Sequence, residues 1–89
     1  MEFTFDTTKD TANIVKHGVS LASTARLDWK SALVWSDERT DHGETRKVAL
    51  ALLESRLYFV VFVDRADVRR VISLRKANYR EVTQYAEND

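Results

Sequence analysis

The chain has 89 residues and a mass of 10.3 kDa, the size of one domain, so we expect residues 1–89 to form a single compact unit. Hydrophobic residues make up 44% of the chain and charged residues 31%, which excludes disorder over most of its length. The absence of cysteine excludes disulfides and thiolate metal sites. No apolar stretch approaches the roughly 20 residues that cross a bilayer, and the start has no basic region before an apolar run, so we expect a cytoplasmic protein with no membrane partner.

The net charge is zero, but the charges are unevenly distributed along the chain. Residues 1–45 carry five basic and eight acidic side chains, whereas residues 46–89 carry nine basic and six acidic ones. From Arg65 to Arg80 there are six basic residues and one acidic residue. A surface with such a local excess can bind phosphate groups. The alternative, which composition alone favours, is a solvated face whose charges form ion pairs.

The first residues predict a strand and a helix. Residues 2–5 alternate polar and apolar side chains, as a short strand does. Asp6 or a following threonine can cap a helix that runs to His17, and Gly18 suits the left-handed position that ends it. Helical spacings of three and four place several polar residues on one face: Lys9, Asn13 and Lys16, with His17 at the edge in the last turn.

A second short helix, a strand and a loop are expected next. Ser20 can cap a helix that extends to about Leu27 and buries Leu21 and Ala25. Residues 32–35 are apolar enough for a strand. The polar and mostly acidic residues 36–44 that follow are expected to form a loop.

The second half of the chain predicts most of the sheet. Residues 46–53, 57–64 and 68–76 form three β-type runs, and their short connections favour antiparallel hairpins. The middle run is apolar on both faces, so we expect it to be the central strand. A terminal helix from Asn78 to about Glu87 is expected to dock through one stripe: Tyr79, Val82 and Ala86, with Tyr85 flanking. The predicted fold is therefore α+β, a single domain with an antiparallel sheet, two N-terminal helices and a C-terminal helix.

Strand alternation predicts a basic surface on this sheet. In residues 68–76 it points Arg69, Val71, Ser73 and Arg75 to one side, with the two arginines about 20 Å apart. Small side chains on the first long run, at Ala49 and Ala51 beside Lys47, leave room above the sheet. We therefore expect a shallow arginine-lined surface, because a guanidinium donates two hydrogen bonds to a phosphate. The alternative is that Arg69 and Arg75 pair with carboxylates: Glu54, Asp64 or Glu81.

His17 is the histidine in an organised position, whereas His42 belongs to the acidic segment and is expected to be solvated. An imidazole ordinarily titrates near neutrality, which suits proton transfer, although a histidine at a helix end is more often structural. Two histidines without cysteine, and with no carboxylate at ligand spacing from His17, fall short of a metal site. The glycine patterns of nucleotide-binding loops are absent from a chain with two glycines.

Residues over nearly the whole chain form a known pattern. Its most specific pieces are the KHGV block at residues 16–19 and the RKA block at residues 75–77. The other members of the pattern are Asp6, Lys9, Asn13, Arg65, Arg69, Val71, Ile72, Ser73, Arg80, Glu81 and Tyr85. In these residues the chain resembles the BrnT family of type II toxins. It departs from that family mainly at packing and turn positions: Phe5 replaces Trp, Leu21 replaces Phe, Asp28-Trp29 replaces Asp-Pro, and Ala51 or its neighbour replaces Gly.

The resemblance implies a fold similar to the RelE ribonucleases and a toxin that inhibits translation by cleaving RNA without metal or other cofactor. A ribose 2'-hydroxyl would attack the adjacent phosphate, and cationic donors would stabilise the charge that develops on its oxygens. The candidate general acid or base is His17, and the candidate stabilisers are Arg65 and Arg75. The candidate RNA-phosphate contacts are Lys16, Arg46, Lys76 and Arg80. The resemblance also implies a partner, a cognate ribbon-helix-helix antitoxin, in a larger hetero-oligomer.

The sequence is also compatible with a second function. The acidic segment and the basic strand face also suit a small non-catalytic module that binds a protein or RNA, with arginines serving recognition. Incubation with labelled RNA in the presence of a chelator separates the two functions.

Overall fold

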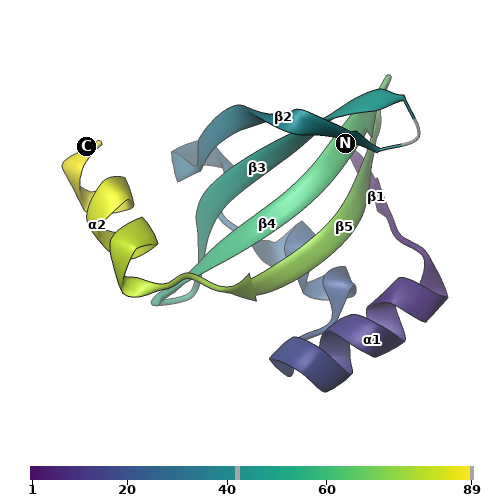
Figure 1. Ribbon diagram of the computed structural model, residues 1–89. Coiled ribbons are helices and arrows are strands. Elements are labelled where there is room, and N and C mark those ends of the chain that lie inside the picture. Colours follow the sequence, from purple (N-terminus) through teal and green to yellow (C-terminus); the bar gives the residue numbers. More distant parts are fainter. Residues whose placement is uncertain (42, 89) are drawn as a thin grey trace.

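Five strands form one sheet in the order β1-β5-β4-β3-β2 (Figure 1). The computed structural model describes residues 1–41 and 43–88, so His42 lies outside the described residues. The elements are β1 (Glu2–Thr4), α1 (Thr7–His17), the 3₁₀ helices η1 (Leu21–Arg26) and η2 (Trp29–Ser31), β2 (Leu33–Asp41), β3 (Glu44–Leu53), β4 (Arg56–Arg65), β5 (Val68–Lys76) and α2 (Tyr79–Glu87). The α+β class and the central place of β4 are confirmed. Neither α1 nor α2 is long and apolar enough to cross a membrane.

The sheet is mixed, which corrects the expectation of an antiparallel one. β2, β3, β4 and β5 pair antiparallel through short turns, but β1 pairs parallel with β5 from Glu2 opposite Val68 to Thr4 opposite Arg70. The chain between β1 and β5 contains α1 and three other strands, so no local turn determines this pairing. β1 covers only the first residues of β5 and leaves the later part of that edge open to other partners.

The segment expected to be a loop, residues 36–44, belongs mostly to strands. β2 continues to Asp41 and β3 starts at Glu44, with Thr40 opposite Thr45 and Asp41 opposite Glu44. The register shifts between Ser36 and Thr40, so the strand is irregular there. The polar composition concealed the strand because β2 lies at the sheet edge, where apolar side chains are not required.

The second helix is 3₁₀ rather than α, and this changes which residues it buries. Ser20 caps η1 as predicted, accepting a hydrogen bond from Ala22 N at 3.1 Å. Because side chains three residues apart align in a 3₁₀ helix, the buried set is Leu21, Thr24 and Leu27. Leu21 is buried as predicted, whereas Ala25 is exposed.

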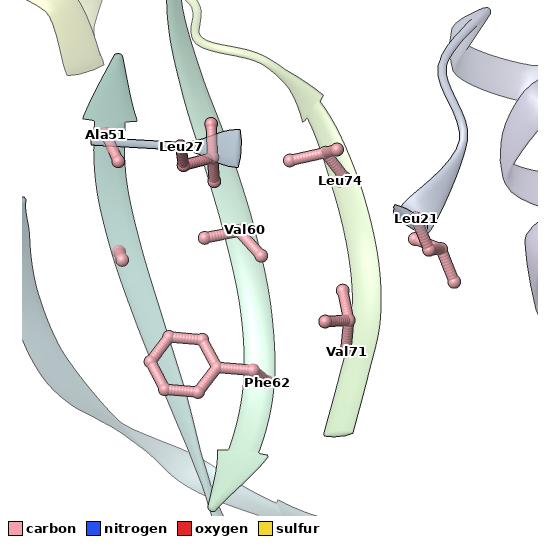
Figure 2. Packing of buried hydrophobic residues seen from close by; sticks show 8 residues of the cluster. Leu21, Leu27, Ala51, Val60, Phe62, Val71 and Leu74 are labelled. Carbon is pink, nitrogen blue, oxygen red and sulfur yellow. The ribbon is translucent and has the colours of Figure 1, made fainter. Parts of the chain in front are cut away.

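The main core lies on one face of the sheet, beneath η1 and η2. We call this the inner face, and it carries Val60 and Phe62 of β4; the outer face carries Phe59 and Val61. Figure 2 shows the buried inner-face cluster, in which the labelled residues are Leu21, Leu27, Ala51, Val60, Phe62, Val71 and Leu74. Burying each large apolar side chain contributes about 1.5–3 kcal/mol. Ala49 and Ala51 are 0% exposed here, so the room expected above them is filled by the core.

A β-bulge in β5 overturns the predicted alternation. Ser73 lies opposite Val61 and Val71 lies opposite Phe62, so Ile72 is an extra residue. One extra residue reverses the alternation that follows it. Arg69, opposite Asp64, is therefore on the inner face and Arg75, opposite Phe59, is on the outer face. The two arginines do not share a surface.

The terminal helix α2 lies beyond the end of β5, and its orientation differs from the prediction (Figure 1). Tyr79 is 87% exposed and Val82 is 44% exposed, so the predicted stripe faces outward. Tyr85 instead packs against the outer-face cluster, and its hydroxyl donates to Ser31 O at 3.0 Å. The prediction that α2 docks through Tyr79, Val82 and Ala86 is therefore wrong, because helical spacing did not determine which side meets the sheet.

Candidate active site

A small pocket lies between α1 and the open edge of β5. We call it the α1–β5 pocket; its volume is about 200 Å³, and its lining residues are Lys9, Ala12, Asn13, Lys16, His17, Ile72 and Ser73. The lining residues include one imidazole and two ammonium groups, and no lining residue that the structure describes is a carboxylate. The pocket is therefore a cationic site with a group capable of proton transfer.

Local signals at both ends of α1 place these side chains. Asp6 caps the helix as predicted and accepts a hydrogen bond from Lys9 N at 3.2 Å. Gly18 ends it in the left-handed conformation, with φ at 74°, and its N–H donates to Ile14 O at 2.8 Å. The helix thus ends directly after His17, which lies in its last turn.

Arg75 lies near this pocket on the outer face. It is two residues from Ser73 on the same face, about 7 Å along the strand. Its guanidinium carbon is 4.2 Å from the centroid of the Phe59 ring. Two hydrogen bonds join it to Glu81, Nη1 to Oε1 at 2.9 Å and Nη2 to Oε2 at 2.8 Å. Arg75 is thus held to the first turn of α2 by a bidentate ion pair.

Glu81 also belongs to the N-terminal cap of α2. Its Oε1 accepts from Asn78 N at 2.9 Å, and the Asn78 side chain accepts from Glu81 N at 2.8 Å, which completes a capping box. Burial alone raises the pKa of the Glu81 carboxyl, but hydrogen bonds from Arg75 and Asn78 and the charge of Arg75 outweigh burial. The net result is a pKa below the usual value.

This pKa shift predicts an acid-sensitive contribution to stability. Because the pKa of Glu81 is lower in the folded protein than in the unfolded chain, its contribution is present above the unfolded pKa and is lost as pH falls through the folded pKa. We expect a melting-temperature gap between wild type and Glu81→Gln at pH 7 that narrows as the pH falls below about 4.5. Thermal unfolding monitored by circular dichroism measures the melting temperatures. A gap that stays constant as the pH falls below about 4.5 contradicts the lowered pKa of Glu81.

The family model described as ribonuclease toxin, BrnT, of type II toxin-antitoxin system matches residues 5–81 of the chain. The chain belongs to the BrnT family. The match extends from just before α1 into the first turn of α2, so it includes both the α1–β5 pocket and the Arg75–Glu81 pair. No curated protein matches the chain.

The predicted activity is therefore confirmed at the level of the family: this BrnT-family chain is a ribonuclease toxin of a type II toxin-antitoxin system. Such a toxin has RNA as its substrate and an antitoxin as its partner. The non-catalytic module considered from the sequence is not the function of this family. The likeness to the RelE fold stays a prediction.

Arg65 is not gathered with the other predicted catalytic residues of this BrnT-family chain. Arg75 lies opposite Phe59, and Arg65 is six residues further along β4, about 20 Å away. Its Nε donates to Glu44 Oε2 at 3.1 Å, and its side chain is 80% exposed. The expectation that Arg65 and Arg75 meet around one phosphate beside His17 is thus not met by the structure.

The predicted RNA contacts are also dispersed. Lys16 lines the α1–β5 pocket, and Lys76 is exposed at the end of β5. Alternation along β3 places the half-buried Arg46 on the outer face, where its Nε is buried without a hydrogen-bond partner among the described residues. Arg80 lines a separate groove of about 810 Å³ between α2 and the edge strand β2.

Arg69 has a structural role. Its Nε and Nη2 donate to the Asp64 carboxylate at 2.7 and 2.9 Å. Its guanidinium carbon lies 4.4 Å from the Trp29 ring centroid and 4.2 Å from that of Phe62. For both Arg69 and Arg75, the alternative of pairing with a carboxylate is confirmed.

Of the seven described lining residues, only Lys16 and His17 were named as candidates from the sequence, and Lys9 and Ser73 are two of the five that were not. Lys9 was placed on the correct helix face, so its spacing from His17 was a usable signal. Ser73 carried no local signal, because only the packing of α1 against β5 brings it to the pocket. Among the described residues, no three histidine, aspartate or glutamate side chains gather as metal ligands.

Proposed function

We propose that RNA is cleaved at the α1–β5 pocket by attack of a ribose 2'-hydroxyl on the adjacent phosphate. The observation that carries the proposal is that His17, Lys9 and Lys16 line one pocket with no carboxylate among its described lining residues. An anionic phosphodiester fits such a site, and a neutral or cationic ligand would leave the two ammonium groups uncompensated.

The reaction needs two proton transfers and charge stabilisation. The 2'-oxygen forms a bond to phosphorus and loses its proton, while the bond to the 5'-oxygen breaks and that oxygen gains a proton. His17 transfers a proton at one of these oxygens. Lys9 and Lys16 donate to the phosphoryl oxygens, where negative charge accumulates. The products are a 2',3'-cyclic phosphate and a 5'-hydroxyl.

Arg75 is the guanidinium that extends this site on the outer face. Its planar fork exchanges the Glu81 carboxylate for phosphoryl oxygens, since a guanidinium can donate two hydrogen bonds to either anion. Arg46, on the outer face, and Lys76, exposed at the end of β5, contact other phosphates of the RNA. Arg65 and Arg80 lie further from the pocket and contact more distant nucleotides.

Cleavage proceeds without a metal ion in this proposal. The cations of the pocket supply the charge stabilisation for which other nucleases use metals. The donor chemistry supports this, because ammonium and guanidinium groups repel metal cations and do not ligate them.

The experiment is cleavage of labelled RNA by the purified chain in excess chelator. We expect fragments that end in a 2',3'-cyclic phosphate, and a loss of at least about tenfold in kcat/KM for the double variant Lys9→Ala/Lys16→Ala. Lys30→Ala, which removes an exposed lysine of η2, is the matched control and should cleave normally. Cleavage that stops in chelator and returns with added metal contradicts metal independence. A double variant as active as Lys30→Ala contradicts the location of the site.

The antitoxin of this toxin is, in the same proposal, a ribbon-helix-helix protein that forms a hetero-oligomer with it in the cytoplasm. Several apolar side chains are available for a protein partner to bury: Val34 on the edge strand, and Tyr79 and Val82 on α2. Co-expression with the protein encoded by a neighbouring gene, followed by measurement of complex mass, tests the partner. A neutralising partner without the ribbon-helix-helix sequence pattern contradicts its assigned type.

A further inference from the structure

Asn13 is the buried residue of α1, with only 6% of its surface exposed. A buried amide must be hydrogen-bonded, because an unpaired polar group in the interior costs about 1–3 kcal/mol. Asn13 meets this requirement through bonds to the backbone of two other segments. Its Nδ2 donates to Leu74 O and to Val19 O, both at 2.9 Å, and its Oδ1 accepts from Leu74 N at 3.2 Å.

These bonds continue the sheet at the open edge of β5. β1 pairs with β5 only as far as Arg70. At Leu74 the Asn13 amide both accepts from the backbone N–H and donates to the carbonyl, as a residue of a neighbouring strand would. The third bond, to Val19, holds the chain just after the helix ends at Gly18.

We propose that Asn13 is a positioning residue for RNA cleavage. It fixes the rotation of α1 about its own axis and its position along β5, so that His17 faces Ser73. Lys9 and His17 each lie four residues from Asn13 and Lys16 lies three away, so all three project from the same side as the anchored amide. This inference rests on the proposed function of the α1–β5 pocket.

An amide satisfies all three backbone groups, because it both donates to the two carbonyls and accepts from Leu74 N. Aspartate lacks the donors that Leu74 O and Val19 O require, and alanine offers no hydrogen bond at all. Without the amide, the helix can shift or rotate relative to β5. A displacement of about 1 Å at a catalytic group can lower a rate about 100-fold.

The experiment compares Asn13→Ala with Leu50→Ala in RNA cleavage by the full chain. Leu50 is fully buried in the outer-face cluster, which contains no residue of α1, so Leu50→Ala reproduces a loss of stability without removing a contact of α1. Both variants are assayed well below their melting temperatures. We expect kcat to fall about 10- to 100-fold for Asn13→Ala, with KM within about threefold of wild type, and kcat to be retained for Leu50→Ala.

A second readout does not depend on activity. In wild type, nuclear Overhauser contacts between the His17 ring and Ser73 are expected, and in Asn13→Ala they should weaken or vanish. Asn13→Ser replaces Asn13→Ala in both measurements if the alanine variant does not fold. Equal kcat in the Asn13 and Leu50 variants, or unchanged His17–Ser73 contacts, overturns the positioning role. Full cleavage by a folded His17→Ala variant would instead overturn the proposed function, whatever the Asn13 result.

Discussion

Replacing His17 with alanine is expected to lower the rate of RNA cleavage about 100- to 10,000-fold, the contribution of a side chain that transfers a proton in the transition state. The other residues that line the pocket are lysine, asparagine, serine and apolar side chains, and the imidazole is the side chain that most often serves as general acid or base. The measurement is the initial cleavage rate of the purified variant on labelled RNA in excess chelator.

The fold should survive this substitution. Within the described residues the His17 side chain makes no hydrogen bond or ion pair, and α1 is held by its caps and by Asn13. The melting temperature of His17→Ala is therefore expected to stay within a few degrees of wild type. His42→Gln removes the other imidazole of the chain and should leave cleavage unchanged. A folded His17→Ala variant that cuts RNA at the wild-type rate would remove His17 from the mechanism.

Local signals in the sequence were sufficient for the parts of the site that lie on α1. Asp6 and Gly18 define the ends of the helix, and spacings of three and four place Lys9, Lys16 and His17 together whatever the helix packs against. β4 and β5 were predicted almost to the residue for a similar reason, since their apolar runs are bounded by short turns. Each of these features depends on neighbouring residues.

The errors arose where structure depends on distant contacts. The bulge at Ile72 shows only in the register of β5 against β4, and by reversing the alternation it separates Arg69 from Arg75. The parallel pairing of β1 joins segments more than 60 residues apart. The orientation of α2 depends on the contact of Tyr85 with Ser31 and on the ion pair between Glu81 and Arg75. These contacts, and not the apolar stripe of α2, determine which side of the helix meets the sheet. Sequence spacing within one element contains no information on such contacts.

The bidentate pair between Arg75 and Glu81 allows two roles for Arg75. In the first, the arginine is structural and fastens α2 to β5. In the second, Arg75 pairs with Glu81 in the free protein and binds an RNA phosphate in the complex. The position of Arg75, two residues from Ser73, favours this second role. The two roles make opposite predictions for the carboxylate partner, because removing Glu81 breaks the link to α2 but leaves the guanidinium available.

If Arg75 stabilises the transition state, Arg75→Ala should lower kcat about 100- to 1,000-fold, whereas Glu81→Gln should cleave RNA at least as fast as wild type. Both substitutions remove the ion pair, so each variant is a control for the loss of that pair, although Arg75→Ala also removes the contact with the Phe59 ring. Stability is checked by thermal unfolding, and kcat is measured well below both melting temperatures. Equal losses of kcat in the two variants would assign Arg75 to the attachment of α2 alone. Full cleavage by a folded Arg75→Ala variant would leave charge stabilisation to Lys9 and Lys16, which are the cations that line the pocket.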